Sequence, residues 1–395
     1  MNFHKMTNIH TPKSPYERPC LLASLPLSDA YPRDIFRGLM KYAHDSQRFA
    51  LRFHDQERHS LEELRTFALG KAAVGIVVFG HNPEIIRIVK ELGMPAVNIS
   101  NTLSETGLPS VLVDNDEVGM VAADHLVKKG YVNHVYIHLE GQDFSYKRRM
   151  GWRRRLKSAG MNTHVITFSD FEQTMSILET LPQPLAITTA NDHLGRSVLD
   201  RCLNVGWSVP EDVAVLGCAN NELVCDGGLV TLSSVPIQGV TVGVVASKVL
   251  IDLIDGDPPP DDLVLIKPGA VVERESTDLI QNAEPDISYA IRYIRTHACT
   301  GIQIADVLAA TNLSRATLDR QVKRVLGHSP HAEIKRIQIE RARHLLANTH
   351  FPLAEISKQC GYKESNYFMR VFREEVGQTP TEYRRDILSK ADMLT

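Results

Sequence analysis

Two stretches near the C-terminus repeat each other at an offset of fifty residues, and this repeat limits what the end of the chain can fold into. "SRATLDRQVK" at 314–323 aligns with "ESNYFMRVFR" at 364–373. In each copy two large apolar residues lie four positions apart, which places them on one face of a helix. A glycine and then a proline end each copy, as expected where a helix stops. The matched pairs are Leu318 with Phe368, Val322 with Phe372, Arg320 with Arg370, Lys323 with Arg373, and Gly327 and Pro330 with Gly377 and Pro380.

A shorter amphipathic segment precedes each copy, "IQIADVLAAT" before the first and "LAEISKQC" before the second. A helix, a turn and a second helix form a helix-turn-helix, whose second helix fits the major groove of DNA. The two short segments align with each other at an offset of forty-nine, whereas the helices that follow them align at fifty. We therefore expect one extra residue in the second turn. The intervening "HAEIKRIQIERARHLLAN" predicts one connecting helix, which could hold the two recognition helices about 34 Å apart, one turn of DNA.

The outward faces of the two predicted recognition helices carry side chains that can contact DNA. Arginine can pair two-pronged with guanine and asparagine with adenine, while basic residues at the helix ends suit phosphates. Each copy alone would also be consistent with a helical hairpin that has solvated charges, but two copies in register disfavour that interpretation. The predicted DNA-binding residues are Arg315, Thr317, Arg320, Lys323, Lys363, Ser365, Asn366, Met369, Arg370 and Arg373.

Charge is distributed unevenly along the chain. Residues 286–395 hold 17 Lys and Arg against 12 Asp and Glu, a net charge of +5, although the whole chain has a net charge of −3. A basic end on an acidic body suggests that only the end contacts a polyanion. On charge alone, a chance fluctuation in composition explains this asymmetry equally well.

From Pro19 to about Glu273, short apolar runs alternate with amphipathic helical segments. This alternation predicts β-α units that build parallel sheets with helices on both faces. About 255 residues is large for one sheet and fits two Rossmann-like lobes. The predicted strands are "CLLASL", "GIVVFG", "PAVNI", "SVLVD", "HVYIHL", "HVITF", "LAITTA", "VAVLGC" and "LVLIKPG".

The polar segment "STDLIQNAEPD" breaks this alternation before the helical region. The predicted organisation is a flexible tail at 1–18, an α/β ligand-binding domain at 19–275, a linker at 276–286 and an all-α DNA-binding domain at 287–388. The start lacks an apolar signal core and no run of eighteen apolar residues occurs, so we expect a cytoplasmic protein without membrane contact. Six scattered cysteines without a CxxC pair favour reduced thiols, with no metal site and no cofactor.

Parallel sheets of this kind bind ligands at the carboxyl ends of their strands. Polar side chains stand at these positions, and each taken alone is equally consistent with a loop or a helix cap. The positions are 25–31, Gly80 and His81, 98–100, Asp114 and Asn115, Asn191 and Asp192, and Ala219 and Asn220.

Two family resemblances cover nearly the whole chain after the tail. Residues 287–387 resemble the AraC/XylS-type DNA-binding domain through the two repeat copies, "RARHLLANT" and the connecting helix. The body resembles the effector domain of LacI/GalR regulators through "RRMGWRRRL", "AITTANDHLGRSVLDRC", "GWSVPEDVAVLGCANNEL", "LSSV" and "VERES". The combination resembles the bacterial xylose operon regulator family. It implies a two-lobed fold of the periplasmic-binding-protein type followed by the helical domain.

The resemblance also implies a sugar site between the lobes. Arg148 would clamp sugar hydroxyls, although it could equally be part of the basic helical run "KRRMGWRRR". The family has an acidic sugar contact where Ala219 stands, so the effector could be xylose, another sugar or a non-sugar compound. The implied ligand-binding residues are Asp114, Arg148, Asn191, Asp192, Asn220 and Gln238.

We therefore predict a transcription regulator, most simply an activator of sugar catabolic genes, that binds double-stranded DNA and a sugar effector. A homodimer is expected from the resemblance, with RNA polymerase as a further candidate partner. The alternatives are a sugar-acting enzyme with a DNA-tethering tail and an exported sugar receptor. No P-loop, GxSxG, HExxH or GxGxxG motif favours an enzyme. His134 and His138 stand on a predicted strand, where an ordinary sheet face is the simpler interpretation than a metal site.

Overall fold

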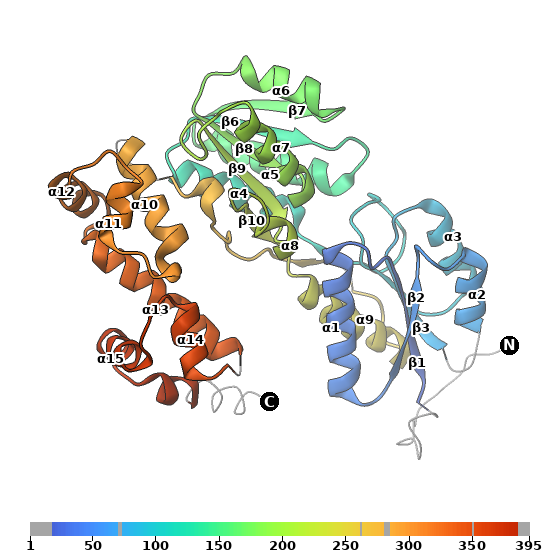
Figure 1. The fold of residues 1–395 in the computed structure, drawn as a ribbon. Helices are drawn as coiled ribbons and strands as arrows, with labels where there is room; N and C mark the ends of the chain where they lie inside the picture. Colours follow the sequence, from blue (N-terminus) through green and yellow to red (C-terminus); the bar gives the residue numbers. More distant parts are fainter. Residues whose placement is uncertain (1–17, 70–72, 261–262, 280–284, 350, 386–395) are drawn as a thin grey trace. The chain divides into compact units, whose positions relative to one another are not determined.

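The computed structural model describes residues 18–69, 73–260, 263–279, 285–349 and 351–385. The chain divides into two compact units, Met1–Leu279 and Ile280–Thr395, which are described separately (Figure 1). The predicted tail lies outside the described residues except for Arg18, as do the last residues of the predicted helical domain. No helix within these described ranges is long and apolar enough to cross a membrane.

The division between the units lies inside the predicted linker at 276–286. The short 3-10 turn η2, Glu275–Thr277, belongs to the first unit, where Ser276 and Thr277 are fully buried. Ser276 donates a hydrogen bond to the carbonyl of Val215, 2.6 Å away, and so ties this turn to the sheet. At the other end, helix α10 already begins at Pro285. Residues at both ends of the predicted linker therefore belong to the turn η2 and to helix α10.

The first lobe of the first unit is built on a parallel sheet with the strand order β2-β1-β3-β4. A bridge from Asn98 to Ser110 connects this sheet to the β5-β11 pair. Helix α9 packs on α1 and on this sheet, although it follows a strand of the other lobe (Figure 1). The elements are β1 Cys20–Leu25, α1 Ala30–Ser46, β2 Ala50–Asp55, α2 Leu61–Leu69, β3 Ala73–Val78, α3 Pro83–Glu91, β4 Ala96–Asn98, β5 Val111–Val113, α9 Gly239–Asp255 and β11 Val264–Ile266.

The second lobe contains a five-stranded parallel sheet with the order β10-β9-β8-β6-β7. The chain passes between the lobes after β5, after β10 and after β11, so the segments between them connect the two lobes. The elements are α4 Asn115–Lys128, β6 Asn133–His138, α5 Asp143–Ser158, β7 Asn162–Thr167, α6 Phe171–Glu179, β8 Leu185–Thr189, α7 Asp192–Asn204, β9 Val213–Ala219, α8 Glu222–Cys225 and β10 Ser233–Pro236.

All nine predicted strands are present, and two others were missed. Strand β2, "ALRFHD", lies at a sheet edge, where a central strand's apolar pattern is not required. Strand β10, "SSVP", is also an edge strand and is only four residues long. The polar residues of these strands are nevertheless buried. His54 of β2 bonds to Ser24, and Ser233 of β10 accepts a hydrogen bond from Thr277, so polar partners within the fold take the place of apolar contacts.

The second unit consists of helices arranged around two small apolar cores. Leu318 and Val322 lie in one core, and Phe368 and Phe372 lie in the other, all of them fully buried as predicted. The long helix α13 contributes Ile334 to the first core and Ile339 to the second, so it connects them. The elements are α10 Pro285–His297, η3 Ala298–Thr300, α11 Ile304–Ala309, α12 Arg315–Leu326, α13 Pro330–Asn348, α14 Leu353–Gln359 and α15 Ser365–Val376.

The expected extra residue in the second turn is not found there. Five residues separate α11 from α12, at 310–314, and five separate α14 from α15, at 360–364. The additional residue lies in α14, which has seven residues where α11 has six. The second copy therefore lengthens its first helix and keeps the turn.

A buried carboxylate fastens the first helix-turn-helix to the connecting helix. Glu333 at the start of α13 is fully buried and accepts hydrogen bonds from Arg295 at 3.0 Å, His328 at 2.8 Å and Arg336 at 2.7 Å. Burial raises the pKa of Glu333, but the bonds from Arg336, His328 and Arg295 outweigh it and lower the pKa to about 2. These bonds join α10, the turn before α13 and α13 itself.

Glu333→Gln should destabilise the second unit at neutral pH by about 1–3 kcal/mol, because a neutral amide cannot replace the charge-assisted hydrogen bonds that the buried carboxylate accepts from Arg295 and Arg336. Because the folded pKa lies below the usual 4.5, the stabilisation by Glu333 is complete above about pH 4.5 and is lost toward pH 2. The difference between wild type and variant should therefore shrink over that range. Both tryptophans, Trp152 and Trp207, lie in the first unit, so a urea transition seen by circular dichroism but not by tryptophan fluorescence reports the second unit.

Glu340→Gln is the matched control for this experiment. Glu340 lies on the same helix, is 72% exposed and pairs with the half-exposed Arg336, so its loss should change stability by less than about 0.5 kcal/mol. Equal effects of the two variants would contradict the role assigned to Glu333.

Candidate functional site

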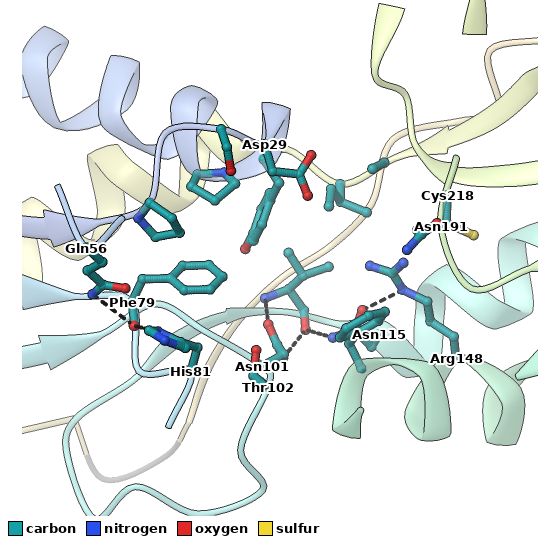
Figure 2. A pocket seen from close by; sticks show the side chains of 18 of the residues that line it. Asp29, Gln56, Phe79, His81, Asn101, Thr102, Asn115, Arg148, Asn191 and Cys218 are labelled. Atoms are coloured by element: carbon teal, nitrogen blue, oxygen red, sulfur yellow. Dashed lines mark hydrogen bonds between the residues drawn. The ribbon is translucent and has the colours of Figure 1, made fainter. Parts of the chain in front are cut away.

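A pocket of about 430 Å³ lies between the two lobes of the first unit (Figure 2). The loops after β1, β2, β3 and β4 line it on one side, and α4, α5 and the ends of β8 and β9 line it on the other. These loops all follow the carboxyl ends of parallel strands, where ligand sites are expected. Figure 2 shows Gln56, Phe79 and His81 across the pocket from Arg148 and Asn191.

The crossing of α4 and α5 positions Arg148 at this pocket. Gly119 of α4 lies so close to α5 that a Cβ at this position would overlap the carbonyl oxygen of Arg148. Gly151 of α5 lies equally close to the carbonyl of Asp116. Because neither glycine has a side chain, the two backbones touch, and Arg148 is held at a fixed depth below the pocket.

Arg148 is 5% exposed and uses part of its guanidinium to bind the protein. Its Nε donates to Asn115 Oδ1 at 2.8 Å, its Nη1 donates to the carbonyl of Ala190 at 2.5 Å, and the group lies over the ring of Phe144. Among the described residues no carboxylate forms an ion pair with Arg148. A guanidinium has five N–H donors, so the remaining donors face the pocket without a protein acceptor.

The opposite wall of the pocket offers polar atoms that have no protein partner. The hydroxyl of Tyr31 and Oε1 of Gln56 are buried without a hydrogen bond within the described structure. Burial raises the pKa of the Tyr31 phenol, and the nearby Arg148 charge opposes this only in part, so Tyr31 remains a neutral donor and acceptor. Buried polar atoms without partners are costly, which indicates that a ligand or solvent satisfies them.

Two of the six predicted ligand residues, Arg148 and Asn191, line the pocket. Oδ1 of Asn191 accepts the backbone N–H of Leu194 and caps α7, which leaves its side-chain amide group as a donor. Asp114 instead caps α4 by accepting from the backbone of Glu117 at 3.0 Å. Asp192 is buried below the pocket wall, where burial raises its pKa although bonds from Ser234 and Asn221 oppose the shift.

Asn220 and Gln238 line a neighbouring hollow along α1 rather than this pocket. Oδ1 of Asn220 accepts from Arg274 at 2.9 Å, and Gln238 occupies the N-cap position of α9. Ala219, between the two hollows, adopts φ +129°, a region that side chains rarely occupy. Such strain at a pocket wall is typical of functional sites.

Several pocket residues were missed as individual candidates. Tyr31, His81 and Asn115 follow predicted strands, so their positions were noted in the sequence. Position after a strand does not distinguish a ligand contact from an ordinary loop residue, so these three were not predicted individually. Gln56 follows the missed strand β2, and Phe144 is exposed to the pocket only through the position of α5. These side chains could be found only from the fold.

The first recognition helix, α12, presents basic side chains on its open face. Arg320 and Lys323 are exposed, while Arg315 pairs with Asp319 at 3.2 Å. Thr317 is partly buried and its hydroxyl lies 2.9 Å from that of Ser314, which caps the helix. The cap therefore engages Thr317, while Arg320 and Lys323 remain exposed on this helix.

The second recognition helix, α15, has a similar open face. Asn366, Arg370 and Arg373 are exposed, as is Lys363 in the preceding turn, while Ser365 and Met369 are partly buried. Arg370 lies over the ring of Tyr367, 5.2 Å from its centre, and Tyr367 is 45% exposed. Tyr367 was not predicted, although an exposed aromatic residue beside an arginine is a usual feature of binding surfaces.

A two-lobed α/β unit with a pocket between its lobes, joined to two helix-turn-helix motifs, defines a ligand-responsive transcription regulator. A family model described as "Periplasmic binding protein-like domain" matches residues 123–277, and one described as "Helix-turn-helix domain" matches residues 307–386.

The chain is 29% identical to the xylose operon regulatory protein of Escherichia coli (strain K12) over 372 residues, which cover 90% of this chain and 94% of that protein. It is 26% identical to the protein of the same name from Haemophilus influenzae, over 90% and 95% of the two chains. A solved structure described as that of the "xylose-binding transcription activator xylR" matches with a TM-score of 0.71 and 28% identity, over 93% and 98% of the two chains. Over nearly its whole length the chain therefore resembles the xylose operon regulators, and it joins a periplasmic-binding-protein-like domain to a helix-turn-helix domain.

Gly119→Ala should force α4 and α5 apart and lower the stability of the first unit by about 1–3 kcal/mol, as overpacking does. Fluorescence of the buried Trp152 on α5 during urea unfolding measures the change. Lys157→Ala, on the exposed face of α5, is the control and should stay within about 0.5 kcal/mol of wild type. A Gly119 variant as stable as this control would show that the close crossing is not needed.

Proposed function

We propose that this chain regulates transcription by binding double-stranded DNA through α12 and α15 and a small carbohydrate through the pocket between the lobes. The observation that carries the proposal is the repeated helix-turn-helix on a basic unit, joined to a pocket that has a buried, partly unsatisfied guanidinium. The relatives are transcription regulators, and we propose no enzymatic activity for this chain. Its place of action would then be the cytoplasm, where its DNA lies.

In this proposal the exposed arginines of the two recognition helices read base edges. Arg320 and Arg370 occupy equivalent positions, and arginine pairs two-pronged with guanine in the major groove. Lys323 and Arg373, one turn further along, contact phosphates, and Asn366 is placed to recognise adenine. The further contacts we propose are Arg315, Thr317, Lys363, Ser365 and Met369.

The connecting helix gives these contacts their spacing. Helix α13 has 19 residues and therefore spans about 28 Å at 1.5 Å per residue. This length suits two recognition helices that enter successive major grooves, about 34 Å apart. A single protomer would then recognise an asymmetric site of two half-sites.

The regulatory step follows from the two lobes. A carbohydrate that contacts both lobes binds the closed arrangement more tightly than the open one, and so shifts the population toward it. We propose that closure changes how two protomers of a homodimer place their DNA-binding units on adjacent sites. The relatives' names favour activation of a sugar operon as the output, and we propose that the activation involves contact with RNA polymerase. The pocket residues proposed to hold the effector are Arg148 and Asn191, with Asp114, Asp192, Asn220 and Gln238 fixing the loops that surround it.

Arg320→Ala and Arg370→Ala should each weaken binding to a selected DNA site by about 10- to 100-fold, the usual cost of losing a base-contacting arginine. Fluorescence anisotropy with a fragment selected by the chain from a random DNA pool measures the affinity. Binding should also weaken steeply with salt, because phosphate contacts release counterions. Arg87→Ala in the first unit removes the same charge and should leave DNA affinity unchanged. Unchanged binding by both recognition-helix variants would mean that another surface contacts DNA.

Arg148→Ala should abolish carbohydrate binding while DNA binding without effector persists, because the two sites lie in different units. Calorimetry of the full chain against pentoses and hexoses, xylose included, measures the first property, and anisotropy measures the second. Normal carbohydrate binding by the variant would move the effector site away from this pocket.

A further inference from the structure

The guanidinium of Arg148 is a buried positive charge that forms no ion pair with any carboxylate among the described residues. Its visible partners are an amide oxygen, a backbone carbonyl and the face of Phe144, all of them neutral. Buried charges in proteins are normally paired with an opposite charge. We propose that the missing partner belongs to the ligand and that the pocket binds a sugar acid, whose carboxylate contacts Arg148. This inference rests on the proposed carbohydrate effector and specifies its chemical class.

The groups around Arg148 favour an acceptor-rich ligand group at this point. The side-chain amide of Asn191 is a donor, since its oxygen already caps α7. Cys218 and Ala219 at the end of β9 add a thiol and a methyl group to the same wall and bring no acceptor. A carboxylate has two oxygens that can accept from the free donors of Arg148 and Asn191 together.

The nearest buried carboxylate does not provide this charge. Asp192 lies close enough for its field to reach Arg148, but the pair is not within ion-pair distance. Both Asp192 oxygens are already used, one by Ser234 Oγ at 2.5 Å and the other by the backbone N–H of Asn221 at 2.7 Å. Asp192 therefore holds the loops at the ends of β9 and β10 and leaves the guanidinium open to a ligand.

The acidic residues that line the pocket lie at its solvent side. Asp29 is 60% exposed and caps α1 by accepting from the backbone of Ala30 at 2.7 Å. Glu57 is exposed and accepts from the backbone of Ser28 at 3.1 Å. Water screens both charges, so they repel a buried anion little. They are well placed to accept hydrogen bonds from ligand hydroxyls.

The remaining walls suit a sugar ring that bears a single negative charge. Phe79, Phe144 and Tyr31 offer apolar faces for the C–H groups of a ring, and Oε1 of Gln56 and the Tyr31 hydroxyl can bind hydroxyls. Arg148 is the single Lys or Arg side chain among the described residues that line the pocket. One guanidinium matches a monocarboxylate better than a phosphate dianion.

The test compares ligands that differ in one carboxylate. Calorimetry of the full chain would use D-glucuronate against D-glucose and D-xylose, and D-galacturonate against D-galactose, with glucose 6-phosphate, acetate and inorganic phosphate as further probes. We expect at least one acid to bind about 10- to 100-fold more tightly than its neutral counterpart, as a charge-assisted hydrogen bond provides. Acetate and phosphate should bind far more weakly, because they lack the ring.

Two variants of Ala219 supply a matched pair. Ala219→Asp places a carboxylate in the same wall as Arg148 and should abolish the preference for the acid. Ala219→Asn adds a side chain of almost the same shape without the charge and should keep the preference. Arg148→Gln should weaken binding of both ligands and remove the preference for the acid, and thermal unfolding checks that each variant folds.

The outcomes separate this inference from the proposed function. Tighter binding of a neutral sugar than of its acid, or binding of the phosphate ester alone, overturns the inference and leaves a carbohydrate-responsive regulator in place. Equal effects of Ala219→Asp and Ala219→Asn on the preference also overturn it. No carbohydrate binding at all by a folded, DNA-binding chain overturns both the inference and the carbohydrate part of the proposed function.

Discussion

The first unit depends on one buried guanidinium and on the helix crossing that holds it. Two glycines allow α4 and α5 to touch, and Arg148 projects from that crossing toward both Asn115 and the end of β8. The same side chain therefore fixes the wall of the pocket and presents charge to it. A buried charge that is left partly unsatisfied raises the free energy of the empty pocket, and a ligand that satisfies it gains the difference.

The second unit is built differently from the first, because one small helical motif occurs twice and both copies pack on the shared helix α13. Neither copy has a large core of its own, and each core is completed by one half of α13. Glu333 accepts hydrogen bonds from Arg295, His328 and Arg336 and so ties the start of that helix to α10 and to the turn after α12. The two helix-turn-helix motifs are thereby held on one connecting helix, and we propose that they contact the two half-sites of one DNA site.

The repeat and the apolar runs were enough to predict the helical motifs and most strands. Leu318 and Phe368 were placed correctly because i, i+4 apolar pairs have one way to be buried on a helix. The pocket was predicted less well, because polar residues after strands serve either as ligand contacts or as caps. Asp114 is a cap, while Asn191 both caps α7 and lines the pocket. Tyr31 and Gln56 became candidates only when the fold showed their buried atoms to lack partners.

The central claim is that the pocket and the DNA-binding unit are coupled. Thermodynamic linkage requires that an effector and DNA alter each other's affinity by the same factor. The measurement is the affinity of the full chain for its selected DNA site with and without saturating carbohydrate, together with the carbohydrate affinity with and without that DNA. The account predicts that both ratios differ from one and agree with each other. Ratios of one, with both ligands bound, would show that the two units act independently and would contradict the account.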